Sequence, residues 1–422
     1  MNTDADAEPD LDADLLATAR ALLGAGPLCD ACLGRPFADR SFGLRNDERG
    51  HALRVTLALD DDADFEPGAG PDCWVCEGIT SRYDGLAARA VEALSGTEFF
   101  TYQVGTRVPP LVEENDELLR EEAGLPPDAG EELKSEVNRE VGRRIGAETG
   151  TEVDFDRPDV QLLLDLDADE VGVQRNSISI FGRYRKLERG IPQTHWEKFE
   201  TSVEELVAPT LVSAHRGTEG VFHGAGREDV DALMLGTGRS FVLEVKSPRR
   251  RDLDLAELED EVNELREGRI EVEGLRYATY EMVERVKELD ASKTYRMDVT
   301  FDEPVSESAL AEAVERLDGA TIEQRTPERV SHRRADLVRE RTVLSMTGGL
   351  TEPDRAELEV HGEGGLYVKE LVSGDGGRTE PSLAGLLGVG ATVTHLDVIA
   401  VEGEAEPFDH PDYLREARKE GS

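Results

Sequence analysis

The sequence predicts an α+β protein with two to three domains, and three observations support this expectation. Its 422 residues are enough to bury at least one complete core, and at typical domain lengths they correspond to two to three domains. Helical and strand patterns follow one another in mixed order along the chain. Hydrophobic residues make up 38% and charged residues 33%, a balance typical of globular proteins.

Three helices are expected in the first part of the chain, where apolar residues recur at helical spacing. They lie at residues 15–24, 86–96 and 133–145, the first two ending near glycines. The segment between the cysteines, residues 29–76, is expected to have strand and turn character, and the long gap between the two CxxC pairs implies an inserted strand or helix. A short apolar run at 160–166 predicts a strand.

A domain boundary is expected near residue 205. A strand is predicted at 178–181 and is followed by the basic stretch 182–190. Ser202-Val-Glu-Glu205 then forms a capping box, which predicts a helix running to about residue 215.

The remainder of the chain is expected to be rich in strands. Apolar residues alternate with polar ones from Tyr295 to Phe301, as in a half-buried strand. Strands are predicted at 241–245, 295–301, 358–360, 366–372 and 393–401, and an amphipathic helix at 310–317.

The charge balance indicates a salt-rich habitat. The net charge is −43, and the chain holds only eight lysines against 40 arginines. Such a charge argues at first against a nucleic-acid partner. At molar salt, however, the Debye length is about 3 Å, so an acidic, lysine-poor surface keeps a protein soluble without strong repulsion. No apolar run approaches membrane-helix length and no secretory signal is evident, so a cytoplasmic protein is expected.

Two CxxC pairs predict a structural zinc site. Cys29, Cys32, Cys73 and Cys76 are the only cysteines of the chain. Four thiolates can close a tetrahedral site with Zn–S bonds of about 2.3 Å. Two disulfides are disfavoured in a cytosol, and one redox pair would leave the second CxxC unexplained.

The segment 224–246 carries the densest chemistry, and it admits two interpretations. In the first, Asp231 and Glu244-Val-Lys246 hold a divalent ion beside a scissile phosphate, as in a metal-dependent nuclease. In the second, Asp229 acts alone in the context Gly-Arg-Glu-Asp, with Arg227 keeping it ionised and aimed. Such a carboxylate can be a nucleophile or a base without any cofactor. A surface turn with an Arg–Asp pair is the plain structural alternative.

Basic clusters and two tyrosines suggest an RNA partner. One cluster comprises Lys246 and residues 249–251, and the other spans residues 325–341 with His332. Within an acidic chain they suggest phosphate contacts, although ion pairs would explain each cluster alone. Tyr295 and Tyr367 could offer stacking faces to a base. Arg378, in a glycine-rich loop, could meet a phosphate or the carboxylate of Asp229.

Several motifs together resemble the archaeal and eukaryotic tRNA pseudouridine synthase family called Pus-ten, over about residues 20 to 400. The resemblance rests on these stretches: Gly226-Arg-Glu-Asp-Val-Asp231, Met234-Leu-Gly-Thr-Gly-Arg239, Cys29-x-x-Cys32-Leu-Gly-Arg35, Arg183-Tyr-Arg-Lys-Leu-Glu-Arg-Gly-Ile-Pro-Gln193, Gln324-Arg-Thr-Pro327, His332-Arg-Arg334, Tyr367-Val-Lys-Glu-Leu371 and Gly377-Arg-Thr379. Leu233 and Ser240 depart from the family pattern, where Arg and Pro are frequent.

The resemblance implies a catalytic role for Asp229 and substrate contacts for Tyr295 and Tyr367. It also implies a cysteine zinc site, a THUMP-like RNA-binding module, and isomerisation of uridines 54 and 55 in the T arm of tRNA. The reaction loses no group and needs no organic cofactor, and Arg227 or Arg378 would keep the carboxylate charged.

The expected organisation follows from these motifs. Residues 1–80 form an acidic N-terminus and a four-cysteine zinc module, 81–205 a THUMP-like domain, and 206–422 a mixed α/β pseudouridine synthase domain. We expect a cytoplasmic monomer that acts on tRNA. The nuclease and a non-catalytic tRNA-binding protein remain as alternatives.

Overall fold

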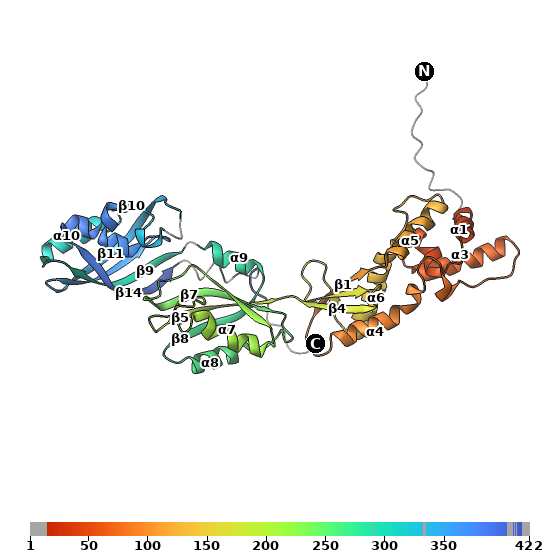
Figure 1. The fold of residues 1–422 in the computed structure, drawn as a ribbon, viewed down its shortest axis with the longest axis horizontal. Coiled ribbons are helices and arrows are strands. Elements are labelled where there is room, and N and C mark those ends of the chain that lie inside the picture. Colours follow the sequence, from red (N-terminus) through yellow and green to blue (C-terminus); the bar gives the residue numbers. More distant parts are fainter. Residues whose placement is uncertain are drawn as a thin grey trace, which may run out of the picture. The chain divides into compact units, whose positions relative to one another are not determined.

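The computed structural model describes residues 15–289, 291–331, 335–402, 408, 410 and 412–415. Contacts divide the chain into an N-terminal unit, Met1–Asn176, and a C-terminal unit, Ser177–Ser422 (Figure 1). Within the described residues, no helix combines the length and apolar character that crossing a membrane requires.

The N-terminal unit is mainly helical around one small sheet. The sheet has the order β2-β1-β3-β4, in which β1 runs parallel to β2 and β3, and β4 runs antiparallel to β3. Its elements are α1 (Leu15–Gly24), α2 (Asp30–Gly34), η1 (Arg35–Phe37), α3 (Asn46–Asp60), η2 (Gly70–Asp72), η3 (Ile79–Arg82), α4 (Tyr83–Ala93), β1 (Thr101–Arg107), α5 (Pro110–Glu122), α6 (Leu133–Thr149), β2 (Glu152–Val153), β3 (Val160–Asp165) and β4 (Glu170–Arg175).

A buried arginine connects parts of this unit that are distant in sequence. The guanidinium of Arg35 is fully buried; it pairs with Asp116 of α5 and lies 3.0 Å from the carboxylate of Glu136 of α6. Its Nη1 also donates to the Sγ of Cys32 at 3.5 Å. Burial raises the pKa of Glu136 to about 7, although Arg35 acts in the opposite direction.

The C-terminal unit is built on one ten-stranded sheet. Its order is β13-β10-β11-β12-β9-β14-β7-β5-β8, with β6 paired to β7. Among the described residues of this sheet, paired strands run antiparallel except β14 and β7, which are parallel. The strands are β5 (Ile178–Lys186), β6 (Glu219–Gly224), β7 (Leu233–Lys246), β8 (Ile270–Ala278), β9 (Ser292–Phe301), β10 (Thr321–Arg325), β11 (Val338–Glu352), β12 (Arg355–Gly362), β13 (Thr379–Glu380) and β14 (Ala391–Glu402).

Helices cover the two halves of this sheet separately. Helices α7 and α8 pack on the half that contains β5 to β8, and α10 packs on β11 (Figure 1). An apolar core lies in each half, and Tyr295 on β9 packs against both. A third, smaller apolar cluster forms where α9 packs on β5 and β7. The helices are α7 (Val203–Ala214), α8 (Leu255–Leu265), α9 (Glu281–Glu288), α10 (Glu307–Leu317), η4 (Glu328–Val330), α11 (Val368–Ser373), η5 (Asp375–Gly377) and α12 (Leu383–Leu387).

Most predicted elements are confirmed, and two expectations were wrong. Residues 366–372 were expected as a strand, but α11 occupies most of this run because Val368, Leu371 and Val372 bury one helical face. The segment between the cysteines is helical in α2 and α3, not strand and turn. The capping box at Ser202 is confirmed, since its hydroxyl accepts from the Glu205 amide.

The contact division falls between Asn176 and Ser177, ahead of the boundary expected near residue 205. Its cause is β5, which pairs along its length with β7 and β8 and so belongs to the large sheet.

Candidate active site

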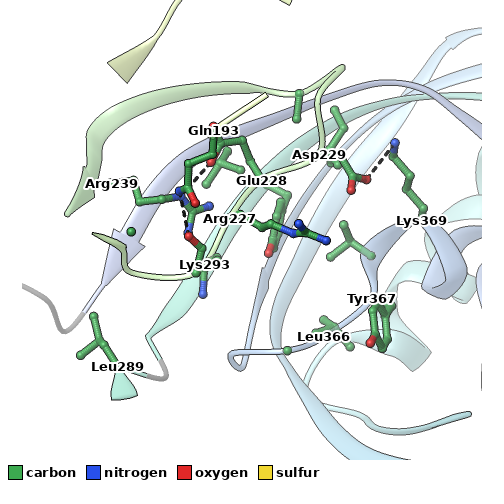
Figure 2. Close-up of a pocket in the computed structure, with 18 of the residues that line it drawn as sticks. Gln193, Arg227, Glu228, Asp229, Arg239, Leu289, Lys293, Leu366, Tyr367 and Lys369 are labelled. Carbon is green, nitrogen blue, oxygen red and sulfur yellow. Dashed lines mark hydrogen bonds and ion pairs between the residues drawn. The ribbon is translucent and has the colours of Figure 1, made fainter. Parts of the chain in front are cut away.

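A pocket of about 760 Å³ opens where the two halves of the large sheet meet. The loop between β6 and β7 forms one wall, and β9, β14 and the start of α11 contribute the others. The parallel pairing of β14 with β7 begins at Leu233, directly after this loop. The sequence Gly226-Arg-Glu-Asp229 therefore lines the pocket close to the point where β7 begins to pair with β14 (Figure 2).

Asp229 faces the pocket and is held between two cations. One carboxylate oxygen lies 3.4 Å from Nη1 of Arg329, and the other lies 3.1 Å from Nζ of Lys369 (Figure 2 shows the lysine). The Asp229 side chain remains 34% exposed. Burial opposes its ionisation, but the charges of Arg329 and Lys369 outweigh this and hold the pKa of Asp229 below its usual range. The carboxylate is thus kept ionised while it stays accessible.

The two cations are themselves positioned by other carboxylates. Nε of Arg329 donates to Glu370 of α11 at 2.6 Å, and the Glu370 side chain is only 6% exposed. Nζ of Lys369 lies 3.1 Å from Asp231 as well as from Asp229. Because Lys369 and Glu370 are neighbours, the first turn of α11 orients both cations.

The neighbouring Glu228 is buried and anchors the loop. Its carboxylate, 1% exposed, accepts from Nε of Arg239 at 2.9 Å and from the Tyr184 hydroxyl at 2.9 Å. Gln193 donates to the same Tyr184 hydroxyl and to the Gly226 carbonyl, both at 2.9 Å. Strands β5 and β7 therefore fix the backbone from which Asp229 projects.

A buried lysine completes this support. Nζ of Lys186, with a side chain 0% exposed, donates to the carbonyls of Ile191, Asp229 and Val230 at 2.9, 3.2 and 3.3 Å. It also lies 3.6 Å from Glu228. Burial lowers the pKa of Lys186, and Glu228 acts against that shift.

Both tyrosines singled out in the sequence line the pocket. Tyr295 projects from β9, and burial raises its pKa to about 12, so its phenol is neutral at ordinary pH. Tyr367 stands just before α11, where the Gln324 side-chain amide bonds both its N–H and its C=O at 2.9 and 3.0 Å. Tyr295 and Tyr367 thus line the cavity from two different elements, β9 and the N-cap position of α11.

The two arginines expected beside Asp229 have other positions. Arg227 lines the pocket (Figure 2) and is exposed, while the cations that pair with the Asp229 carboxylate are Arg329 and Lys369. Arg378 donates to the Thr326 carbonyl at 2.6 Å and lies 3.4 Å from Asp336. It thereby braces the segment that leads into Arg329.

The residues of the nuclease interpretation have separate partners. Asp231 pairs with Lys369, whereas Glu244 accepts from His223 at 2.9 Å and from Lys246 at 3.1 Å. Neither Asp231 nor Glu244 is among the described residues that line the pocket.

Part of the second basic cluster lies outside the described residues, namely His332, Arg333 and Arg334. Of the described part, Arg325 pairs with Asp336 and Arg329 with Asp229 and Glu370. In the first cluster Arg251 is buried.

The four cysteines come together in the N-terminal unit. All are buried, and their Sγ atoms lie within 4.8 Å of one another, the only such group of potential metal ligands in the described chain. Sγ of Cys29 and Sγ of Cys76 are 3.8 Å apart, and no disulfide links them. Tetrahedral bonds of about 2.3 Å give the same ligand separation. The cluster therefore fits a zinc ion.

Several residues of the pocket and of its support were missed in the sequence. Glu228 stood within the Gly-Arg-Glu-Asp motif, but nothing local distinguishes a buried acid from its exposed neighbour. Lys186 and Arg329 lay in noted basic stretches, and Lys369 lay in the stretch Tyr367-Val-Lys-Glu-Leu371, all without any assigned contact. Trp196 also lines the pocket, and no pattern had indicated it.

Comparisons with known proteins agree with this two-unit architecture. The model for the C-terminal part of Pus10 matches residues 179–402, and the model for the archaeal Pus10 THUMP domain matches residues 86–165. The protein thus combines a THUMP domain with an α+β domain of the pseudouridine synthase class.

Relatives extend the match over nearly the whole chain. The tRNA pseudouridine synthase Pus10 of Halorubrum lacusprofundi is 58% identical, covering 96% of this chain and 100% of its own. Those of Methanothrix thermoacetophila and Pyrococcus furiosus are 42% and 38% identical, over 92% and 93% of this chain and 95% and 99% of theirs. The chain belongs to the Pus10 family.

Proposed function

We propose that this chain is a tRNA pseudouridine synthase, an isomerase that converts uridine to pseudouridine. The observation that carries the proposal is Asp229, ionised between Arg329 and Lys369 at the surface of a pocket, in a chain of the Pus10 family. The resemblance noted in the sequence places the target uridines at positions 54 and 55 of the T arm.

The chemistry suits such a carboxylate. The N1–C1′ bond of uridine breaks, the base rotates, and a C5–C1′ bond forms; C5 loses a proton and N1 gains one, so the net change is an isomerisation. Asp229 serves as the nucleophile at the sugar or as the base that takes a sugar proton. No step transfers electrons or releases a group, so the reaction needs no organic cofactor.

The other site residues have supporting roles in this proposal. Tyr295 and Tyr367 contact a uridine that has left its stack, an event that costs a few kcal/mol. Arg227, exposed in the pocket, contacts substrate phosphate or the base. Arg378 acts indirectly, by holding the segment that presents Arg329 to Asp229.

The N-terminal unit holds the RNA and is stabilised by metal. Cys29, Cys32, Cys73 and Cys76 hold a structural zinc ion, and the THUMP region contacts tRNA through phosphates, which sets the register of the substrate. Residues 1–80 and the THUMP region precede a catalytic unit that begins near residue 177. The proposal includes a monomeric, cytoplasmic enzyme.

The test is pseudouridine mapping on a T-arm transcript in molar KCl with EDTA. We expect isomerisation by the native chain, loss of it in Asp229→Asn, and retention in Glu244→Gln, which alters a carboxylate that a nuclease would need. Strand breaks that appear when Mg²⁺ replaces EDTA would instead support the nuclease. Tight binding of unmodified RNA by the native chain would leave only a tRNA-binding protein.

A further inference from the structure

The loop between β5 and α7 presents an exposed tryptophan to the pocket, with a half-buried phenylalanine packed against it. Trp196 lines the pocket and is 38% exposed; its ring lies 5.0 Å from that of Phe199 between centroids. The Phe199 amide donates to the Trp196 carbonyl at 2.9 Å, which closes a tight turn between the two rings. Nζ of Lys198 lies 5.8 and 5.7 Å from the two ring centroids.

This aromatic pair is fixed relative to Asp229. On one side, Gln193 donates to the Gly226 carbonyl in the loop that carries Asp229. On the other, the His195 ring lies 2.8 Å from Glu205 in the first turn of α7. Both anchors precede Trp196 by at most three residues, so the backbone that carries its ring is preorganised and little ordering cost would remain on binding.

Three lysines line the same cavity. Of eight lysines in the chain, Lys287, Lys293 and Lys369 line this one pocket. Lys369 is engaged with Asp229 and Asp231. Figure 2 shows Lys293 and Leu289 on the side of the pocket away from Lys369 and Tyr367. The cations at this second side are not needed to ionise Asp229.

We propose that Trp196, Phe199, Lys287 and Lys293 form a subsite for a second nucleotide, directly next to the target uridine in the RNA strand. The inference rests on the proposed function. The neighbouring base stacks on Trp196, and the two lysines contact its phosphate. An aromatic face with nearby cations is the combination that binds single-stranded nucleic acid without reading its sequence. A cavity of about 760 Å³ has room beyond one extruded base.

The test is a binding cycle on T-arm stem-loop RNA in the Asp229→Asn background, which prevents turnover. We expect Trp196→Ala to weaken Kd roughly tenfold and Trp196→Phe much less, as base–aromatic stacking predicts. On RNA with an abasic nucleotide 5′ or 3′ of the target, the Trp196→Ala effect should disappear for one of the two positions. Tyr280→Ala, which removes another exposed aromatic ring, should leave Kd unchanged.

The lysines are tested by salt dependence. Lys287→Ala and Lys293→Ala should each lower the slope of log K against log [KCl] by about 0.7. Arg316→Ala, on the exposed side of α10, should not change the slope. An equal Trp196→Ala effect on intact and both abasic RNAs would overturn the subsite even if native protein forms pseudouridine. If the Trp196→Ala effect disappears on one abasic RNA but the native protein forms no pseudouridine, the proposed function is overturned and the subsite stands.

Discussion

Removing the charge of Glu228 should destabilise the C-terminal unit more than any surface carboxylate change. Glu228→Gln preserves the side-chain volume but leaves the buried cations Arg239 and Lys186 without their shared anion. All three side chains are at most 1% exposed, so water cannot compensate.

The magnitude follows from this burial. Breaking a buried ion pair from one side costs about 3–5 kcal/mol, because a charge is left uncompensated. Glutamine can still hydrogen-bond Tyr184, so we expect the lower figure, about 3 kcal/mol of the free energy of unfolding. Arg239→Met should cost a similar amount. The double variant should lose at least about 1 kcal/mol less of the free energy of unfolding than the sum of the two single variants. The reason is that each substitution removes the charge that the other substitution leaves unpaired.

Urea unfolding followed by tryptophan fluorescence measures this directly. The chain has two tryptophans, and in a Trp74→Phe background only Trp196 of the C-terminal unit reports. Glu271→Gln, which breaks a half-exposed pair with Arg185, is the matched control and should cost below about 1 kcal/mol. Strictly additive losses for Glu228→Gln and Arg239→Met would refute the argument that these charges form one buried network.

Three further predictions concern charge and metal. Lys369→Met should move the acid limb of the pH–rate profile upward, because the pKa of Asp229 is held down by that ammonium; a uniform loss at every pH would mean that Lys369 acts on substrate instead. The folded-state pKa of Glu136, about 7, lies above its ordinary value, so its contribution to stability is present at low pH and lost as pH rises through 7. The melting temperature of the Glu136→Gln variant should therefore change less than that of the native chain as pH rises through 7. Cys29→Ser should release about one zinc per chain by metal analysis and lower the melting temperature of the N-terminal unit; unchanged metal content would contradict the site.

Local patterns predicted most elements of the fold, and they failed at one short apolar run for a physical reason. The run Leu366–Val372 is apolar and short, so its length fits a strand, yet Val368, Leu371 and Val372 bury a helical face. Strand and helix cannot be separated by periodicity over so few residues. Burial against the sheet decided the outcome.

The site was predictable only where its residues are adjacent in sequence. Gly-Arg-Glu-Asp229 marked the carboxylate, and the pocket forms around it. Its partners Arg329 and Lys369 are 100 and 140 positions away, so the topology of the sheet alone brings them to Asp229. Arg227 is close in sequence, yet these two distant cations are the ones that pair with the carboxylate.

Two adjacent acids in this loop have opposite environments, and the difference explains how a salt-adapted chain keeps a working carboxylate. Molar salt screens exposed charges but has little effect on buried ones. Glu228 is 1% exposed and fixes the loop through buried cations, so salt does not weaken that anchor. Asp229 is 34% exposed and must admit a substrate, yet its ammonium partner on Lys369 is only 23% exposed. A chain that has few lysines thus retains Lys186 and Lys369 where the solvent ions reach least.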